Sequence, residues 1–109
     1  MALSVGTTKE SLAQNLSTMG SWIAAYTNAT TEATGGLYAR KQTTWSAGTA
    51  GDGIYSGSQV EIDVPAGTYT HVAVFAASTG GSAIDVIDIT DQVFASAGKL
   101  LVTPTITVV

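Results

Sequence analysis

The single histidine of the chain, His71, is the only side chain that could act as an imidazole base. Acyl transfer needs a nucleophile, a histidine and a carboxylate that converge, and no G-x-S-x-G turn in the sequence would present a serine for this purpose. His71 lies beside Tyr69 and Val72 in an uncharged stretch, where a hydrogen-bonded structural histidine is the commoner case. We therefore predict no catalytic residue and a protein that is not an enzyme.

Three aspartates, Asp85, Asp88 and Asp91, recur every third residue and raise the question of a metal site. In a strand, however, Asp85 and Asp88 would point to opposite faces, and the D-x-[DN]-x-[DN]-G pattern of a calcium loop is absent. The chain has no cysteine and one histidine, which excludes a zinc-thiolate or multi-histidine site within one chain. We predict neither a metal nor a cofactor.

Aromatic side chains could bind sugars, because their flat faces stack on pyranose rings. In small β proteins such residues mostly fill cores or interfaces instead. A carbohydrate-binding β-sandwich that uses Tyr38 and Trp45 therefore remains an alternative function. The aromatic residues considered are Trp22, Tyr26, Tyr38, Trp45, Tyr55 and Tyr69.

Charged residues make up only 11% of the 109 residues, against roughly 25% in an average soluble domain. This shortage indicates that other protein covers part of the surface, or else that Ser, Thr and Gly solvate it. The net charge of −4 argues against a nucleic-acid partner, which requires clustered Lys and Arg. No apolar run approaches the ~18 residues of a membrane span, and no basic segment precedes an apolar one at the N-terminus. We expect no membrane partner and no secretion signal.

A helix is predicted over residues 7–19. Thr7 and Glu10 have the spacing of a capping box, and Gly20 could end the helix in the left-handed conformation. An apolar stripe follows the helical period through Leu12, Leu16, Met19 and Ile23. A strand over residues 22–26 comes next.

The rest of the chain follows a period of two, which is typical of strands. After a polar loop at 27–36, alternation predicts strands over 37–48 and 59–64, the second with Val60, Ile62 and Val64 facing the core. Pro65 and Gly67 favour a tight turn that would join 59–64 to 69–77 as an antiparallel hairpin. The latter segment has no charge on either face, which is typical of a central or covered strand. Further strands are expected over 83–89 and 100–109, with Pro104 favouring a sheet edge.

These elements predict a mainly β protein: an antiparallel β-sandwich or open barrel with one N-terminal α-helix. We expect a single domain over residues 1–109, of which 1–20 form the lead and helix and 21–109 the sandwich. This size can bury one core without disulfides or metal.

Several of these segments resemble a family of small virion structural proteins from tailed bacteriophages that infect actinobacteria. The family pattern has a Glu-x-x-Gly-Gly-x-Tyr-Ala-Arg segment before a Thr-Trp, then a Val-Pro-Ala-Gly-Thr turn with Thr-His, an aromatic residue and an Ala-x-x-Gly-Gly turn. The resemblance covers most of the chain after Gly20. The matching residues are Glu32, Gly35, Gly36, Tyr38, Ala39, Arg40, Thr44, Trp45, 64–68, Thr70, His71, Phe75, Ala77, Gly80 and Gly81.

The resemblance implies a non-enzymatic virion component, made in the bacterial cytoplasm, that decorates the outer surface of the major capsid lattice. Its partners would be the major capsid protein and further copies of itself. A minor tail or tail-fibre module, with tail proteins as partners, is the alternative within the virion. We expect the helix 7–19 or the loop 27–36 to contact the shell. The candidate interface residues are Leu12, Leu16, Trp22, Tyr26, Tyr38, Arg40, Trp45 and Phe75.

Overall fold

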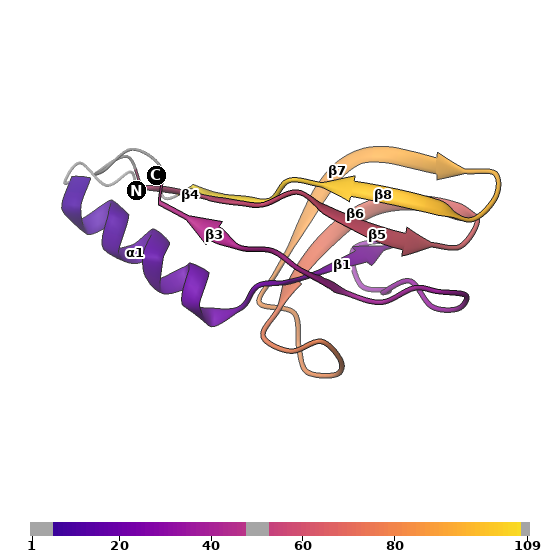
Figure 1. The fold of residues 1–109 in the computed structure, drawn as a ribbon, viewed down its shortest axis with the longest axis horizontal. Coiled ribbons are helices and arrows are strands. Elements are labelled where there is room, and N and C mark those ends of the chain that lie inside the picture. Colours follow the sequence, from indigo (N-terminus) through magenta and orange to yellow (C-terminus); the bar gives the residue numbers. More distant parts are fainter. Residues whose placement is uncertain (1–5, 48–52, 108–109) are drawn as a thin grey trace.

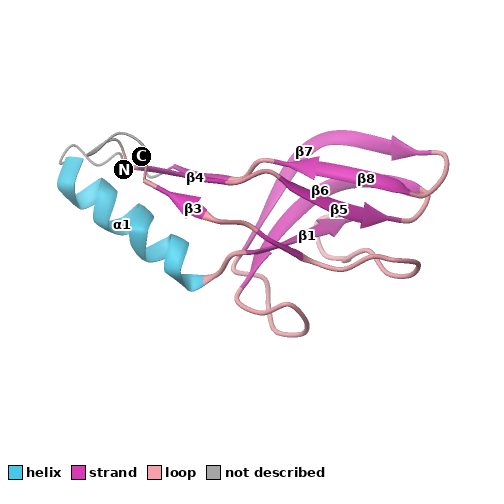
Figure 2. Ribbon diagram, viewed as in Figure 1, coloured by secondary structure: helices cyan, strands magenta, loops and turns pink. Residues whose placement is uncertain are grey.

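The computed structural model describes residues 6–47 and 53–107, which form a mainly β protein with one helix near the N-terminus (Figures 1 and 2). The fold-class prediction is thereby confirmed. The elements are α1 (Gly6–Met19), β1 (Trp22–Tyr26), β2 (Lys41–Gln42), β3 (Trp45–Ser46), β4 (Ile54–Gly57), β5 (Val60–Val64), β6 (Gly67–Phe75), β7 (Asp85–Phe94), β8 (Gly98–Val102) and β9 (Thr105–Thr107).

The strands form three antiparallel sheets, with the orders β2-β1-β6-β7, β3-β4-β9 and β5-β8. The molecule is elongated, measuring 46 × 24 × 22 Å along its principal axes. Helix α1 and the small sheet β3-β4-β9 form one end, and the layered sheets form the other (Figure 1). This arrangement leaves α1 outside the sandwich, beside β4 and β9.

The main core lies between the four-stranded sheet and the pair β5-β8. Ile23, Tyr69 and Val72 contribute from one side, and Ile62 and Leu100 from the other. The opposite face of β1 and β6 carries a second buried cluster made by Ala24, Tyr26, Ala73 and Phe75. Strand β6 is thus central and buried on both faces, as its uncharged sequence predicts.

Several local predictions are confirmed. Strand β1 has the predicted bounds, and α1 ends at Met19 as expected. In β5, Val60, Ile62 and Val64 are buried, whereas Glu61 is exposed and Asp63 half-buried, so the period-two alternation places one face in the core. The helix begins at Gly6, one residue before Thr7. The side chains of Thr7 and Glu10, and hence the expected capping box, lie outside the described part of the chain.

The predicted hairpin between 59–64 and 69–77 is wrong. Strand β5 pairs with β8, and β6 pairs with β1 and β7. The turn at Pro65 therefore connects two sheets. Gly67 does adopt a positive φ of 153°, and the hydroxyl of Tyr69 donates a 2.6 Å hydrogen bond to the Pro65 carbonyl. The pairing of these strands depends on contacts distant in sequence.

Three strand boundaries also differ from the prediction. The expected strand over 37–48 consists of the two short strands β2 and β3, because Thr43 turns inward and its hydroxyl bonds to the Ser58 carbonyl at 2.7 Å. The strand expected at 83–89 runs from 85 to 94. The last segment breaks at Pro104 into β8 and β9, and β9 lies at a sheet edge, as the proline indicated.

Gly20 is required by close packing and not by a left-handed conformation. It is absent from the glycines with positive φ, so the predicted C-terminal cap is wrong. A Cβ atom at Gly20 would lie 2.5 Å from both the Phe75 carbonyl oxygen and Ile84 Cδ1. The glycine thus allows the chain after α1 to lie directly on the end of β6.

We expect Gly20→Ala to lower the free energy of unfolding by about 2 kcal/mol, because the backbone carbonyl cannot move aside without displacing β6. Urea unfolding measures this change. Gly36→Asn is a matched control, since no atom lies within 4 Å of that position and Asn tolerates its φ of 59°. Equal stability of Gly20→Ala and the natural chain would contradict the packing argument.

Candidate functional site

Arg40 is the centre of a buried polar cluster that joins three segments of the chain. Its Nε and Nη2 atoms each donate a 2.9 Å hydrogen bond to a different carboxylate oxygen of Glu32. Its Nη1 atom donates to the carbonyls of Ala77 (3.0 Å) and Gly80 (2.9 Å). The guanidinium also lies 3.4 Å from the centre of the Phe75 ring. A planar, bidentate donor suits this position and a lysine would not.

Glu32 and Tyr38 complete the cluster. The Tyr38 hydroxyl donates to Glu32 Oε2 at 2.7 Å and accepts a 3.1 Å hydrogen bond from the Ala25 amide. Hydrogen bonds from Arg40 hold the pKa of Glu32 below its usual value, and burial together with the Glu32 carboxylate raises the pKa of Tyr38. At neutral pH, Glu32 and Arg40 are therefore both charged, and the Tyr38 phenol is neutral.

The cluster serves as a structural anchor. It fixes the loop between β1 and β2 and the turn after β6 onto the outer face of the four-stranded sheet. Within the described residues, no buried side-chain nitrogen or oxygen atom lacks a hydrogen-bond partner. The residues of this anchor are Glu32, Tyr38, Arg40, Phe75, Ala77 and Gly80.

Helix α1 presents its apolar stripe to the surface. Leu12, Leu16 and Met19 are 43%, 40% and 50% exposed, whereas the small side chain of Ala13 is the one that is fully buried. The predicted apolar stripe is present on α1, and the chain's own core does not cover it. The helix lies beside β4 and β9, and its buried alanine, Ala13, allows a close approach. The larger apolar side chains of the helix remain partly exposed.

An open groove of about 320 Å³ continues this apolar surface. It is lined by Leu16 from α1, Trp45 from β3, Ile87 from β7 and Ile106 from β9. The Trp45 indole donates a 3.0 Å hydrogen bond to the Gly20 carbonyl, which orients the ring across the end of the helix. Helix stripe and groove together form a candidate contact surface, which we call the α1 surface: Leu12, Leu16, Met19, Trp45, Ile87 and Ile106.

The structure divides the predicted interface residues into three groups. Leu12, Leu16 and Trp45 belong to the α1 surface. Tyr26, Arg40 and Phe75 are buried at 7%, 8% and 3% exposure within the chain. Trp22 and Tyr38 are half-buried and pack against the two core clusters.

The remaining sequence candidates are dispersed. His71 Nδ1 lies 2.7 Å from the Thr70 hydroxyl, and its Nε2 atom lies 3.8 Å from an exposed Asp88 carboxylate. In the described part of the chain, no three His, Asp or Glu side chains gather as metal ligands. Tyr38 and Trp45, the pair considered for sugar binding, line different grooves.

Sequence reasoning missed the ion pair between Glu32 and Arg40, and treated Arg40 as a surface residue. The available signal was their separation of eight residues across the Gly35-Gly36 turn, where both glycines have positive φ. Such a turn folds the two flanks back toward each other.

No family model, curated protein or solved structure matches this chain. Within residues 6–47 and 53–107, no helix is long and apolar enough to cross a membrane.

Proposed function

We propose that this chain is a non-enzymatic structural protein of a bacteriophage virion, which decorates the outer surface of the major capsid lattice and contacts its own copies there. The observation that carries the proposal is the α1 surface, an uncovered apolar face on a chain with few charges. Contiguous exposed apolar surface is typical of protein contact sites. The resemblance of the anchor segments to small virion proteins supports the choice of partner.

On a symmetric lattice, a modest contact surface is sufficient. Each copy of a decoration protein meets an identical site, and contacts between neighbouring copies add to the contact with the shell. The three half-exposed apolar side chains of α1 and the groove beside them then provide the contact with the shell, and no deep binding pocket is needed. The anchor formed by Arg40 would keep the loops rigid, so that little ordering entropy is lost on assembly.

The test is to locate and count the protein in intact phage particles. Immunogold labelling shows its position, and quantitative mass spectrometry gives its copy number relative to the capsid subunit. We expect label over the heads and a copy number comparable with that of the capsid subunit. Label confined to tails with few copies would replace this proposal with a minor tail module. Absence from the particles would overturn both virion functions.

A further inference from the structure

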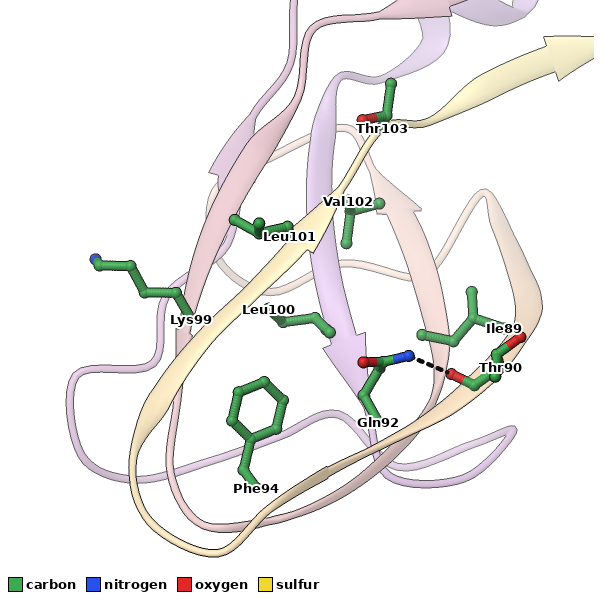
Figure 3. A pocket seen from close by; sticks show the side chains of 9 residues that line it. All are labelled: Ile89, Thr90, Gln92, Phe94, Lys99, Leu100, Leu101, Val102 and Thr103. Carbon is green, nitrogen blue, oxygen red and sulfur yellow. Dashed lines mark hydrogen bonds between the residues drawn. The ribbon is translucent and has the colours of Figure 1, made fainter.

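Strands β7 and β8 are consecutive and joined by residues 95–97, yet they do not pair with each other. Among the described residues, β7 pairs only with β6, β8 only with β5, and β9 only with β4. Figure 3 shows β7 and β8 diverging from their connecting turn, with the side chains of Phe94, Leu100 and Ile89 between them. Two strand edges without a neighbour thus flank a common gap.

This gap, which we call the seam, follows the length of β7. Its first part is an open groove of about 430 Å³ between residues 89–94 and 99–103. Farther along, the groove beside Trp45 lies between residues 84–87, at the start of β7, and residues 104–107 of the C-terminal segment. The same two chain segments therefore line both grooves, over a length that suits a strand of several residues.

The backbone of β7 is irregular at the seam. Residues 89–91 lie opposite the single residue Thr70 of β6, which interrupts the ladder. The Thr90 carbonyl there accepts a 3.2 Å hydrogen bond from the side-chain amide of Gln92, and both residues line the groove (Figure 3). An open strand edge offers N–H and C=O groups to an extended peptide.

The charges along β7 indicate what kind of peptide fits. Asp85, Asp88 and Asp91 are exposed, and none forms an ion pair with a Lys or Arg of the described chain. The three cationic side chains that the structure describes are already paired, Arg40 with Glu32, and Lys41 and Lys99 with Asp63. A second copy would bring an equally acidic β7, and like charges on paired strands repel. Charge complementarity therefore favours a basic segment of a different protein.

We propose that the seam binds an extended segment of another protein in which apolar residues alternate with Lys or Arg. The apolar residues would face Ile89, Phe94 and Leu100. The basic residues would lie on the opposite face of the inserted strand, the face that carries Asp88 opposite His71 of β6. The inserted strand would hydrogen-bond to β7 on one side and to β8 on the other. This inference does not depend on the proposed virion function.

The test uses the full chain and a synthetic peptide, acetyl-Thr-Val-Lys-Val-Lys-Val-Lys-Val-Thr-amide, with binding followed by calorimetry and by amide NMR shifts. We expect saturable binding of one peptide per chain, with the largest shifts in β7 and β8. The same peptide with Glu in place of Lys should bind at least tenfold more weakly, and so should one with three alternate backbone nitrogens methylated.

Protein variants test the charge argument separately. We expect Asp85→Asn, Asp88→Asn and Asp91→Asn together to weaken binding about tenfold. Glu61→Gln, which removes an exposed carboxylate from β5, is the matched control and should leave binding unchanged. Three results would overturn the proposal: no saturable binding up to about 1 mM peptide, equal binding of the methylated peptide, or a dimer in solution that buries the seam against a second copy. Each can be obtained without phage particles, so failure here is distinct from failure of the virion function.

Discussion

Replacing Arg40 with Ala is expected to lower the free energy of unfolding by about 3 kcal/mol, because it leaves the partly buried Glu32 carboxylate without its cation. The substitution also removes the donors to the carbonyls of Ala77 and Gly80, so the turn after β6 loses its attachment. Arg40→Lys should recover only part of this loss, since an ammonium cannot bind both Glu32 oxygens and both carbonyls in one plane. Chemical denaturation with circular dichroism measures the change.

The ion pair of Lys99 with Asp63 is the matched control, because it has a similar 2.8 Å distance but an exposed setting. Lys99→Ala should change stability far less than Arg40→Ala.

The pH dependence of the free energy of unfolding gives a second readout. The pKa of Glu32 is lowered on folding, so its contribution is complete above the unfolded value of about 4.5 and is lost as the pH falls through the folded pKa. If the stability of Arg40→Ala fell with decreasing pH as steeply as that of the natural chain, this account would be contradicted.

Replacing Leu12, Leu16 and Met19 together with Gln is expected to weaken attachment to phage particles about 100-fold. Each side chain is about half exposed in the free chain, and covering the remainder contributes ~1 kcal/mol apiece. Glutamine is a good helix former, so α1 should persist and thermal stability should change little. Co-sedimentation of labelled protein with particles that lack it measures the effect.

Gln14→Ala with Asn15→Ala is the control for this experiment, since both positions are exposed on α1 and neither is apolar. These substitutions should leave attachment unchanged. If the Gln variant still bound particles as well as the natural chain, the α1 surface would be excluded as the contact with the shell. The loop at 27–36, which is mostly exposed, would then be the next segment to test.

The two surfaces lead to different expectations about partners. The α1 surface is apolar and suits a broad, repeated contact, whereas the seam combines backbone hydrogen-bonding groups with acidic side chains and suits one extended segment. The two surfaces share the groove beside Trp45, which Ile87 and Ile106 line, so two partners that both fill this groove would compete. The Gln variants of α1 and the Asn variants of β7 separate the two contacts experimentally.

The sequence alone predicted the elements whose signals are local. The helical spacing of Leu12, Leu16 and Met19, the alternation in β5 and the uncharged faces of β6 each report the conformation of one segment. The hydrophobic period and the composition of a segment identify a helix, a strand with one buried face or a central strand, because these signals depend on neighbours within a few residues. Together, these local signals predicted a mainly β protein with one helix.

Only the tertiary structure decided which segments pair and which surfaces remain open. The turn at Pro65 has the chemistry of a hairpin, yet β5 pairs with β8, because burial of Ile62 against Leu100 and Tyr69 outweighs the local preference. Arg40 is internal because Glu32, from the loop between β1 and β2, and Ala77 and Gly80, from the turn after β6, converge on it. The helix stripe faces outward because Ala13 makes the contact instead. Such outcomes depend on packing between residues far apart in the chain, which a local pattern does not encode.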